Sequence, residues 1–343
     1  MREIDQALLR RALTVVRRNL PASEWDLHAA SIALDRSSHE THLRKEERDV
    51  DRTLFGELER FQSAGLLRLP FALPPDVVAA LRLHLDGQAA HPGAHTLSSR
   101  EGCIQRPLDE LPRGTSMAGY TLGQLLRTPG LVDLFNRPAI VDFVERFLRC
   151  VPTLYSLNGW RSFPATAPEG ASVQFFHRDS DDWKFCTLFV YLTDVDLDSG
   201  PHQVIVGSHT VPGMEYLLAR ARSLGQDVSG FDVARSFTET SGPELSTRCE
   251  QVLQDGIRTV TGPAGTMFLV NTLALHRGLV PSRSSRLVLW ARYGMGPNTN
   301  SADLEQGPLC RAQLPTTLPD TPRSRYVNRL LFEFERGPFI PGK

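Results

Sequence analysis

The sequence has no long apolar run, almost no net charge and very little lysine. No segment approaches the roughly 20 consecutive apolar residues that a membrane-spanning helix requires. The formal net charge of −1 argues against the strongly basic surface that accompanies nucleic-acid binding. Lysine occurs only at positions 45, 184 and 343, so the cationic side chains are almost all arginine. We therefore expect neither a membrane nor a nucleic acid as a partner.

Cysteine is too sparse and too scattered for a disulfide framework. The five cysteines form no CxxC pair and lie at positions 103, 150, 186, 249 and 310. Such usage is typical of reduced thiols in the cytosol. The first 20 residues are charged and amphipathic, and they lack the apolar core of a signal peptide. These features predict a cytoplasmic protein.

Several common cofactor motifs are also missing. Neither GxxxxGK[ST] nor GxGxxG occurs, which argues against the usual nucleotide-binding folds. The run His39-Glu-Thr-His42 is one residue short of the HExxH zinc motif. A calcium loop starting at Asp179 would need glycine at its sixth position and glutamate at its twelfth, where Lys184 and Val190 stand. A zincin or calcium site is therefore not expected.

The pattern of apolar residues changes at about residue 150. Before it, helical periodicity predicts helices at 3–19, from the charged stretch 44–52 to about 63, and at 76–85, 121–135 and 138–149. A short strand is expected at 65–70 and a long loop at 88–118. After it, short segments rich in β-branched and aromatic residues predict strands at 153–163, 172–177, 184–194, 202–206, 258–261, 266–270 and 286–294. Further helices are expected at 212–224 and 325–336, with a polar excursion to residue 255 between the strands.

This order predicts a mainly β fold with α elements. Many short strands separated by turns favour a jelly roll, the double-stranded β-helix of cupin-like proteins, and the early helices would form an N-terminal layer on it. We divide the chain into an N-terminal helical extension (1–55), a catalytic jelly-roll domain (56–300) and a C-terminal extension with a helix (301–343).

Two clusters about a hundred residues apart carry the candidate chemistry. His177 and Asp179 lie two positions apart, so in an extended segment their side chains point to the same face. His276, which follows the predicted strand at 266–270, can supply a second imidazole. Two histidines and one carboxylate on one face form the triad of non-haem Fe(II) oxygenases, which leaves positions open for O₂ and a co-substrate. We take these three residues as both metal ligands and catalytic residues.

Arg286 follows the second histidine by ten residues and begins a predicted strand. Its planar guanidinium can pair with a carboxylate through two hydrogen bonds, as a dicarboxylate co-substrate requires. The sequence therefore predicts an enzyme that uses Fe(II) and 2-oxoglutarate. Arg283 is a weaker candidate for the same role, because it does not adjoin the strand. An HxD pair can also be an ordinary surface turn, and His276 a hydrogen-bonded histidine without a metal.

The strand predicted after the first cluster has two different faces. Phe185, Thr187, Phe189 and Tyr191 alternate with Cys186, Leu188, Val190 and Leu192. Two interpretations are open: the strand is buried on both sides, or its aromatic and hydroxylated face lines the barrel interior beside the iron. The second interpretation makes Thr187 and Phe189 candidate cofactor-binding residues.

These residues together resemble the phytanoyl-CoA dioxygenase family over about 60–295. The resemblance rests on His177-Arg-Asp179, Leu192-Thr-Asp, the turn ending Asp198-Ser-Gly200, Val206-Gly-Ser-His209, and His276 with Arg286. It implies a double-stranded β-helix that binds Fe(II) through the triad and the distal carboxylate of 2-oxoglutarate through Arg286. It further implies co-substrate contacts for Trp183, Phe189 and Asn158.

The sequence departs from the family in two places that matter. The position two residues after the distal histidine, often Ser or Thr in the family, is Gly278, and His202 stands where Leu is more usual. His202 and Gln174 are candidate substrate contacts. The relatives that halogenate lack the carboxylate ligand, so the presence of Asp179 favours hydroxylation.

We therefore expect an oxygenase that uses O₂ to hydroxylate an unactivated C–H bond of a small molecule, such as a specialised metabolite, a sugar or an acyl compound. One alternative is a catalytically silent jelly-roll protein that binds a small molecule or glycan. Another is a cupin-like metalloenzyme that does not use 2-oxoglutarate, against which Arg286 argues.

Overall fold

The computed structural model describes most of the chain, namely residues 24–40, 43, 50–93, 104–165, 172–179, 181–237, 242–295, 310–311 and 318–333. The helix expected at 3–19 lies outside these residues. Among the described residues, none of the helices combines the length and apolar character of a membrane span.

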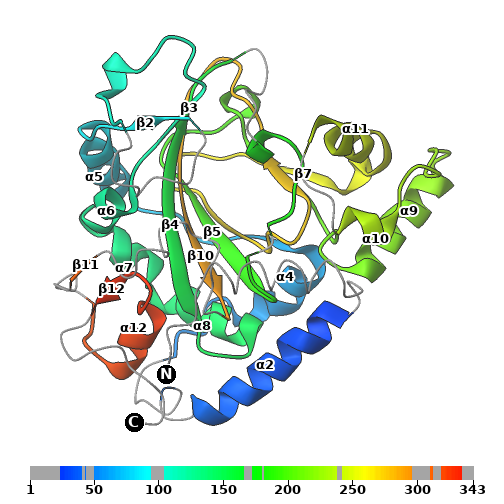
Figure 1. Cartoon of the computed structure of the whole chain (residues 1–343), viewed down its shortest axis with the longest axis horizontal. Coiled ribbons are helices and arrows are strands. Elements are labelled where there is room, and N and C mark those ends of the chain that lie inside the picture. The colour runs from blue at the N-terminus through cyan, green and yellow to red at the C-terminus, as the bar shows by residue number, and fades with distance from the viewer. Residues whose placement is uncertain are drawn as a thin grey trace.

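Two antiparallel sheets form the centre of the molecule, as the jelly-roll prediction requires (Figure 1). The major sheet has the order β1-β8-β5-β10-β4-β3-β2. Its strands are β1 (Leu66–Arg68), β2 (His91–Pro92), β3 (Met117–Gly119), β4 (Thr153–Ser162), β5 (Phe185–Tyr191), β8 (Met267–Val270) and β10 (Arg286–Gly294). The minor sheet has the order β7-β6-β9 and contains β6 (His202–Ile205), β7 (Ile257–Val260) and β9 (His276–Gly278). Side chains from both sheets pack together in the space between them.

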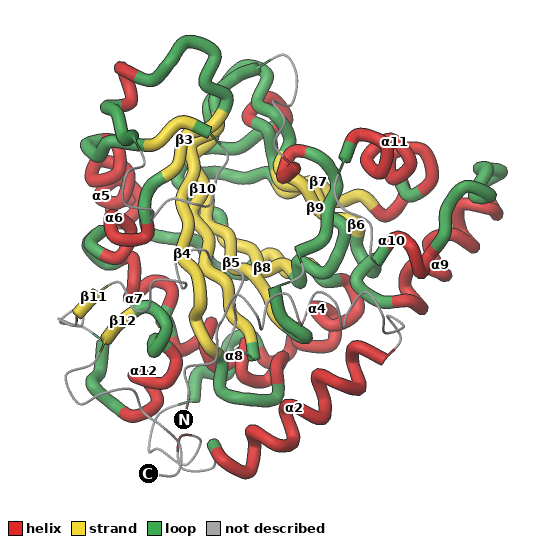
Figure 2. Tube along the Cα trace, viewed as in Figure 1, coloured by secondary structure: helices red, strands yellow, loops and turns green. Residues whose placement is uncertain are grey.

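Helices cover the outer face of the major sheet (Figure 2). They are α4 (Leu58–Ala64), α5 (Pro75–Asp86), α6 (Leu122–Leu126), α7 (Leu131–Phe135) and α8 (Pro138–Leu148). Leu287, Leu289 and Ala291 of β10 face this helical layer, whereas Val288 and Trp290 face the minor sheet. Alternation along the strand thus separates a purely structural core from the interior of the jelly roll.

Three helices lie beyond the minor sheet, in the long connection between β6 and β7. They are α9 (Val211–Ser223), α10 (Val233–Ser236) and α11 (Pro243–Val252). Thr210 begins α9, because its hydroxyl accepts a hydrogen bond from the N–H of Gly213 at 3.1 Å. These helices bury their apolar side chains against Ile205 of β6 and Phe176.

The segments from the two ends of the described chain contact each other. They are α2 (Trp25–His39) and α12 (Pro322–Val327), which is followed by β12 (Phe332–Glu333) paired with β11 (Cys310–Arg311). The buried carboxylate of Glu40 accepts hydrogen bonds from the Tyr326 hydroxyl at 2.6 Å, from Arg36 Nε at 2.7 Å and from the Val151 N–H at 2.9 Å. One carboxylate therefore ties three distant parts of the chain together.

Several predicted elements differ from the observed ones. The segment expected to be a strand at 172–177 is a short 3₁₀ turn (Ser172–Gln174) followed by a single bridge at His177. Strand β9 and helix α2 were not predicted, and β2 and β3 lie within the expected loop. The C-terminal helix α12 starts earlier than expected, because the Thr321 hydroxyl caps it by accepting from the Ser324 N–H at 3.2 Å.

Candidate metal centre and co-substrate pocket

The two segments that carry the candidate ligands meet through backbone hydrogen bonds. His177 and His276 form an antiparallel bridge in which each backbone N–H donates to the other residue's carbonyl at 3.0 Å. The N–H of Asp179 donates to the carbonyl of Thr272 at 2.9 Å. The backbone therefore holds the three side chains together without help from a metal.

The three side chains place one nitrogen or oxygen atom each around a common point. His177 Nε2 lies 3.8 Å from Asp179 Oδ1, and His276 Nε2 lies 3.8 Å from Asp179 Oδ2. All three ligand atoms lie within 4.8 Å of one another. This donor set, with two imidazole nitrogens and one carboxylate oxygen, fits Fe(II).

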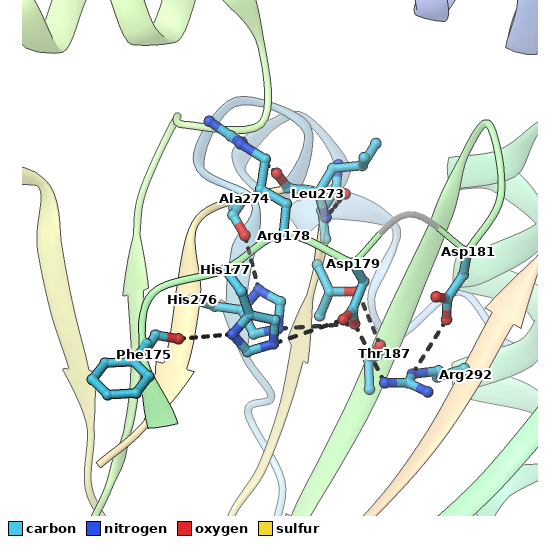
Figure 3. Close-up of polar contacts among 12 residues, drawn as sticks. Phe175, His177, Arg178, Asp179, Asp181, Thr187, Leu273, Ala274, His276 and Arg292 are labelled. Atoms are coloured by element: carbon cyan, nitrogen blue, oxygen red, sulfur yellow. Dashed lines mark hydrogen bonds and ion pairs between the residues drawn. The ribbon is translucent and has the colours of Figure 1, made fainter. Parts of the chain in front are cut away.

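Hydrogen bonds fix the tautomer of both histidines (Figure 3). Nδ1 of His177 lies 2.9 Å from the Phe175 carbonyl, and Nδ1 of His276 lies 2.8 Å from the Ala274 carbonyl. A carbonyl oxygen only accepts, so each Nδ1 carries the proton and each Nε2 keeps a free lone pair. Both histidines thus present the nitrogen that faces Asp179 as a metal ligand.

Burial and neighbouring charges keep the ligands in the states that bind a metal. Burial, followed by the charge of His177, lowers the pKa of His276 to about 3. Burial raises the pKa of Asp179, but Arg292 and then the two histidines more than offset it, so the pKa lies below its usual value. At neutral pH the site therefore holds neutral imidazole and ionised carboxylate.

Arg292 on β10 was not identified from the sequence, although it contacts a candidate ligand. Its Nη2 lies 3.5 Å from Asp179 Oδ2, and its Nε lies 3.5 Å from Oδ2 of Asp181 (Figure 3). The Tyr155 hydroxyl donates to the same Asp181 oxygen at 2.8 Å. These contacts form a buried series of polar side chains that links β4 to the metal centre. Alternation from Arg286 could have indicated Arg292, since residues six apart on a strand share a face.

A pocket of about 80 Å³ opens beside the triad between the two sheets. Besides the triad, residues that the sequence analysis singled out line it, namely Gln174, Phe189, Tyr191, His202, Gly278 and Arg286. The rest of its wall is largely apolar and aromatic: Met117, Trp160, Val173, Val288, Trp290 and Arg292.

Arg286 is buried in this pocket with no acidic partner. Its side chain is 6% exposed, and among the described residues no carboxylate lies within 4 Å of it. Nη2 lies 3.4 Å from the Ser162 hydroxyl, while Nε has no hydrogen-bond partner. A buried guanidinium normally requires a carboxylate or an equivalent acceptor. The pocket therefore has the electrostatic character of an anion-binding site.

Gly278 provides the space that Arg286 occupies. A Cβ atom at this position would lie 2.9 Å from Arg286 Nη2, closer than such contacts normally come. The departure from Ser or Thr at this position thus has a steric reason.

His202 is a further polar residue of the pocket wall. It pairs with Gly278 across β6 and β9, and its ring lies 4.5 Å from the ring of Phe189. Burial, followed by the charges of His276 and Arg286, keeps the pKa of His202 well below its usual value. The imidazole is therefore neutral.

Thr187 and Asn158 face the interior without lining the pocket. The Thr187 hydroxyl lies 3.3 Å from that of Thr272, and Thr187 pairs with Arg292 across β5 and β10. Asn158 donates through Nδ2 to the Ser156 hydroxyl at 2.6 Å. Both side chains thus lie behind the residues that form the pocket wall.

Trp183 is not among the residues that line this pocket. Trp183 belongs to the turn before β5, packs against both outer core clusters and stacks on His28 of α2 at 5.1 Å between ring centres. The residues of this turn do not follow the alternation of a strand, so six positions from His177 do not bring the indole to the pocket.

Comparison with known proteins identifies the family. The family model for phytanoyl-CoA dioxygenase (PhyH) matches residues 61–279, more than half of the chain. The chain belongs to the phytanoyl-CoA dioxygenase family. Among curated proteins, none matches the chain. Enzymes of this family depend on Fe(II) and 2-oxoglutarate, and this member is an oxygenase-type enzyme with the same requirements. The matched region contains the triad but ends before Arg286, whose role therefore has to be inferred from the structure.

Several solved structures resemble the chain. AviO1 from Streptomyces viridochromogenes Tue57 is 15% identical with a TM-score of 0.41, and the similarity covers 72% of this chain and 96% of AviO1. The epimerase SnoN from nogalamycin biosynthesis, solved with Fe³⁺, alpha ketoglutarate and nogalamycin RO, is 18% identical with a TM-score of 0.45, covering 70% and 82%. HygX from Streptomyces hygroscopicus, solved with nickel and 2-oxoglutarate, is 17% identical with a TM-score of 0.39, covering 70% and 86%.

Proposed function

We propose that this protein hydroxylates an unactivated C–H bond of a small molecule, using Fe(II), O₂ and 2-oxoglutarate. The observation that carries the co-substrate assignment is Arg286, a buried cation that lines the pocket without a carboxylate partner among the described residues. The distal carboxylate of 2-oxoglutarate would supply that partner through a two-point hydrogen bond. The other end of the same molecule would reach the metal centre.

In this proposal His177, Asp179 and His276 hold the metal. O₂ would be the oxidant and Fe(II) would activate it, so that one oxygen atom enters the substrate and the other enters succinate as 2-oxoglutarate loses CO₂. The protein orients the co-substrate through Arg286 and excludes water with the aromatic wall around Phe189 and Trp290. The presence of Asp179 supports hydroxylation, because the carboxylate occupies the position that a halide would need.

The pocket wall also bears on the substrate. Trp160 and Trp290 contact each other edge to face at 4.9 Å and give the pocket an apolar surface. The amide oxygen of Gln174 is buried there without a hydrogen-bond partner. These features support a small substrate with an apolar C–H face and a neighbouring hydroxyl or amine donor, for which Gln174 would be the acceptor.

The test is turnover of 2-oxoglutarate by the metal-loaded protein. In air, the wild type is expected to form succinate slowly without substrate and faster with a substrate, whereas His276→Ala is expected to form none. The metal content of both proteins should be measured in parallel. No succinate from metal-loaded wild type, with or without candidate substrates, would contradict the proposal and favour a silent binding protein.

A further inference from the structure

His202 occupies a special place between the metal centre and Arg286. Cross-strand pairing of His202 with Gly278, and of Val204 with His276, places the His202 side chain on the interior face of the minor sheet. Its ring lies nearly parallel to the ring of His276, at 5.5 Å between centres. On the other side, Gly278 is in contact range of the Arg286 guanidinium. A ligand that spans from the triad to Arg286 would therefore lie near His202, which lines the same pocket.

The backbone N–H of His202 is hydrogen-bonded, but one nitrogen of its ring has no hydrogen-bond partner. The His202 N–H donates to the Tyr191 hydroxyl at 3.0 Å, and that hydroxyl donates to the Val260 carbonyl at 2.9 Å. Nε2 of the ring is buried without any hydrogen-bond partner, although the residue is only 7% exposed. Buried polar atoms are rarely left unpaired in folded proteins, so an orphaned one on a residue that lines the pocket indicates a polar ligand there.

The surroundings of the ring define the chemistry of that ligand. After burial, the groups with the largest effect on the pKa of His202 are His276, Arg286 and His177. Phe189 and Phe268 cover the ring at 4.5 and 5.6 Å between centres and offer no acceptor. A neutral imidazole in this position has one N–H to donate, and the neighbouring cation favours an anionic acceptor.

We propose that His202 donates a hydrogen bond to a carboxylate oxygen of 2-oxoglutarate and so helps Arg286 to position the co-substrate. This inference rests on the proposed function and assigns His202 to the co-substrate, not to the substrate as the sequence suggested. His202 is a positioning residue in this view, and a leucine in its place could pack against Phe189 but could not make the hydrogen bond.

The experiment measures co-substrate binding without turnover. 2-Oxoglutarate is titrated by calorimetry into Ni(II)-loaded wild type, His202→Leu, His202→Gln and Gln203→Leu. Gln203 is the matched control, because it neighbours His202 on β6 but points to the other face, where it accepts from Arg277 at 2.9 Å. Ni(II) affinity and melting temperature are measured for each protein.

His202→Leu is expected to raise the Kd for 2-oxoglutarate by roughly ten-fold, the usual effect of losing a hydrogen bond to a charged group. His202→Gln, which keeps a donor, is expected to recover much of the loss, and Gln203→Leu to bind like the wild type. Equal Kd values for wild type and His202→Leu would overturn the inference while leaving the proposed function intact. Loss of Ni(II) affinity in His202→Leu would instead identify His202 as a metal ligand, and no binding by the wild type would refute the proposed function itself.

Discussion

Arg292 lies 3.5 Å from Oδ2 of Asp179, the carboxylate oxygen that also faces His276 at 3.8 Å. A buried guanidinium and a candidate metal site therefore share one carboxylate. Asp181, which accepts a hydrogen bond from the Tyr155 hydroxyl, pairs with Nε of the same guanidinium, so Arg292 cannot move away from Asp179 without losing this contact. We regard Arg292 as the residue that orients the carboxylate ligand.

Replacing Arg292 by methionine is expected to weaken metal binding by roughly 10- to 100-fold, as is usual when a group that orients a ligand is lost. Without the guanidinium, burial would also raise the pKa of Asp179, so metal binding should fail at a higher pH than in the wild type. Ni(II) titrations at several pH values measure both effects. Arg220→Met is the control, because Arg220 on α9 pairs with Asp255 at an exposed site. Unchanged affinity in Arg292→Met would exclude the orienting role.

Replacing Arg286 by lysine is expected to raise the apparent KM for 2-oxoglutarate roughly ten- to a hundred-fold, because lysine cannot reproduce the two-point contact with a carboxylate. Metal binding should persist, since Arg286 does not contact the triad. Succinate formation as a function of 2-oxoglutarate concentration provides the measurement. If KM does not change, Arg286 is not the co-substrate anchor.

Gly278→Ser restores a residue that is common in the family, yet here it is expected to weaken co-substrate binding. The new Cβ would lie 2.9 Å from Arg286 Nη2 and would displace the guanidinium. The KM for 2-oxoglutarate should rise without a loss of metal. Gly230→Ala serves as the control, because a Cβ at that position would meet nothing within 4 Å. A KM equal to that of the wild type would show that Arg286 tolerates the added atom.

The metal-free protein is expected to lose stability as the pH falls. His276 has a pKa of about 3 in the folded state, whereas a histidine in the unfolded chain titrates near 6.5. The unfolded chain therefore binds a proton that the folded chain does not, so the stabilisation is complete above pH 6.5 and declines toward pH 3. The maximum slope for this one group is about 1.4 kcal/mol per pH unit. Urea unfolding at pH 7 and pH 5 should show a smaller pH effect in His276→Asn; an equal effect would contradict the prediction.

The triad and Arg286 could be predicted because their residue types and their order in the sequence are characteristic of this kind of metal site. Two histidines, one carboxylate and one arginine at characteristic positions need no knowledge of the packing. Alternation places Arg292 on the same face as Arg286, but only the packing of a turn against β10 brings it to Asp181. Trp183 lies in a turn, where a given separation in sequence from His177 does not fix the direction of the side chain.

The fold followed from the same kind of information. Strands with two distinct faces, such as β5 and β10, were predicted with nearly correct bounds. Helix α2 was missed because its pattern is ambiguous: Leu27 and Leu34 are 71% and 75% exposed, while small residues such as Ala29 and Ala33 form the buried side. Strand β9 is only three residues long and is defined by its partners, which a local pattern does not reveal.

Tyr326→Phe is expected to destabilise the protein by about 1–3 kcal/mol, because Glu40 loses a donor to its buried carboxylate. The free energy of unfolding in urea measures the change. Arg325→Gln, which removes a pair with Asp320 on the surface of the same helix, is the control and should have a much smaller effect. Equal stability of Tyr326→Phe and the wild type would mean that Arg36 and Val151 alone satisfy Glu40.

The position of Tyr326 also sets the order in which the protein can be completed during synthesis. All residues of the candidate metal centre, including Arg292, leave the ribosome before Tyr326 does. Until Tyr326 is made, Glu40 lacks the hydrogen bond that the Tyr326 hydroxyl donates. The end of helix α2 therefore completes its hydrogen bonds late, when all strands of the jelly roll have already been synthesised. A product of premature termination near residue 300 would contain the whole metal centre but leave a buried carboxylate short of a donor. Such a product should be recognised and degraded more readily than the full chain.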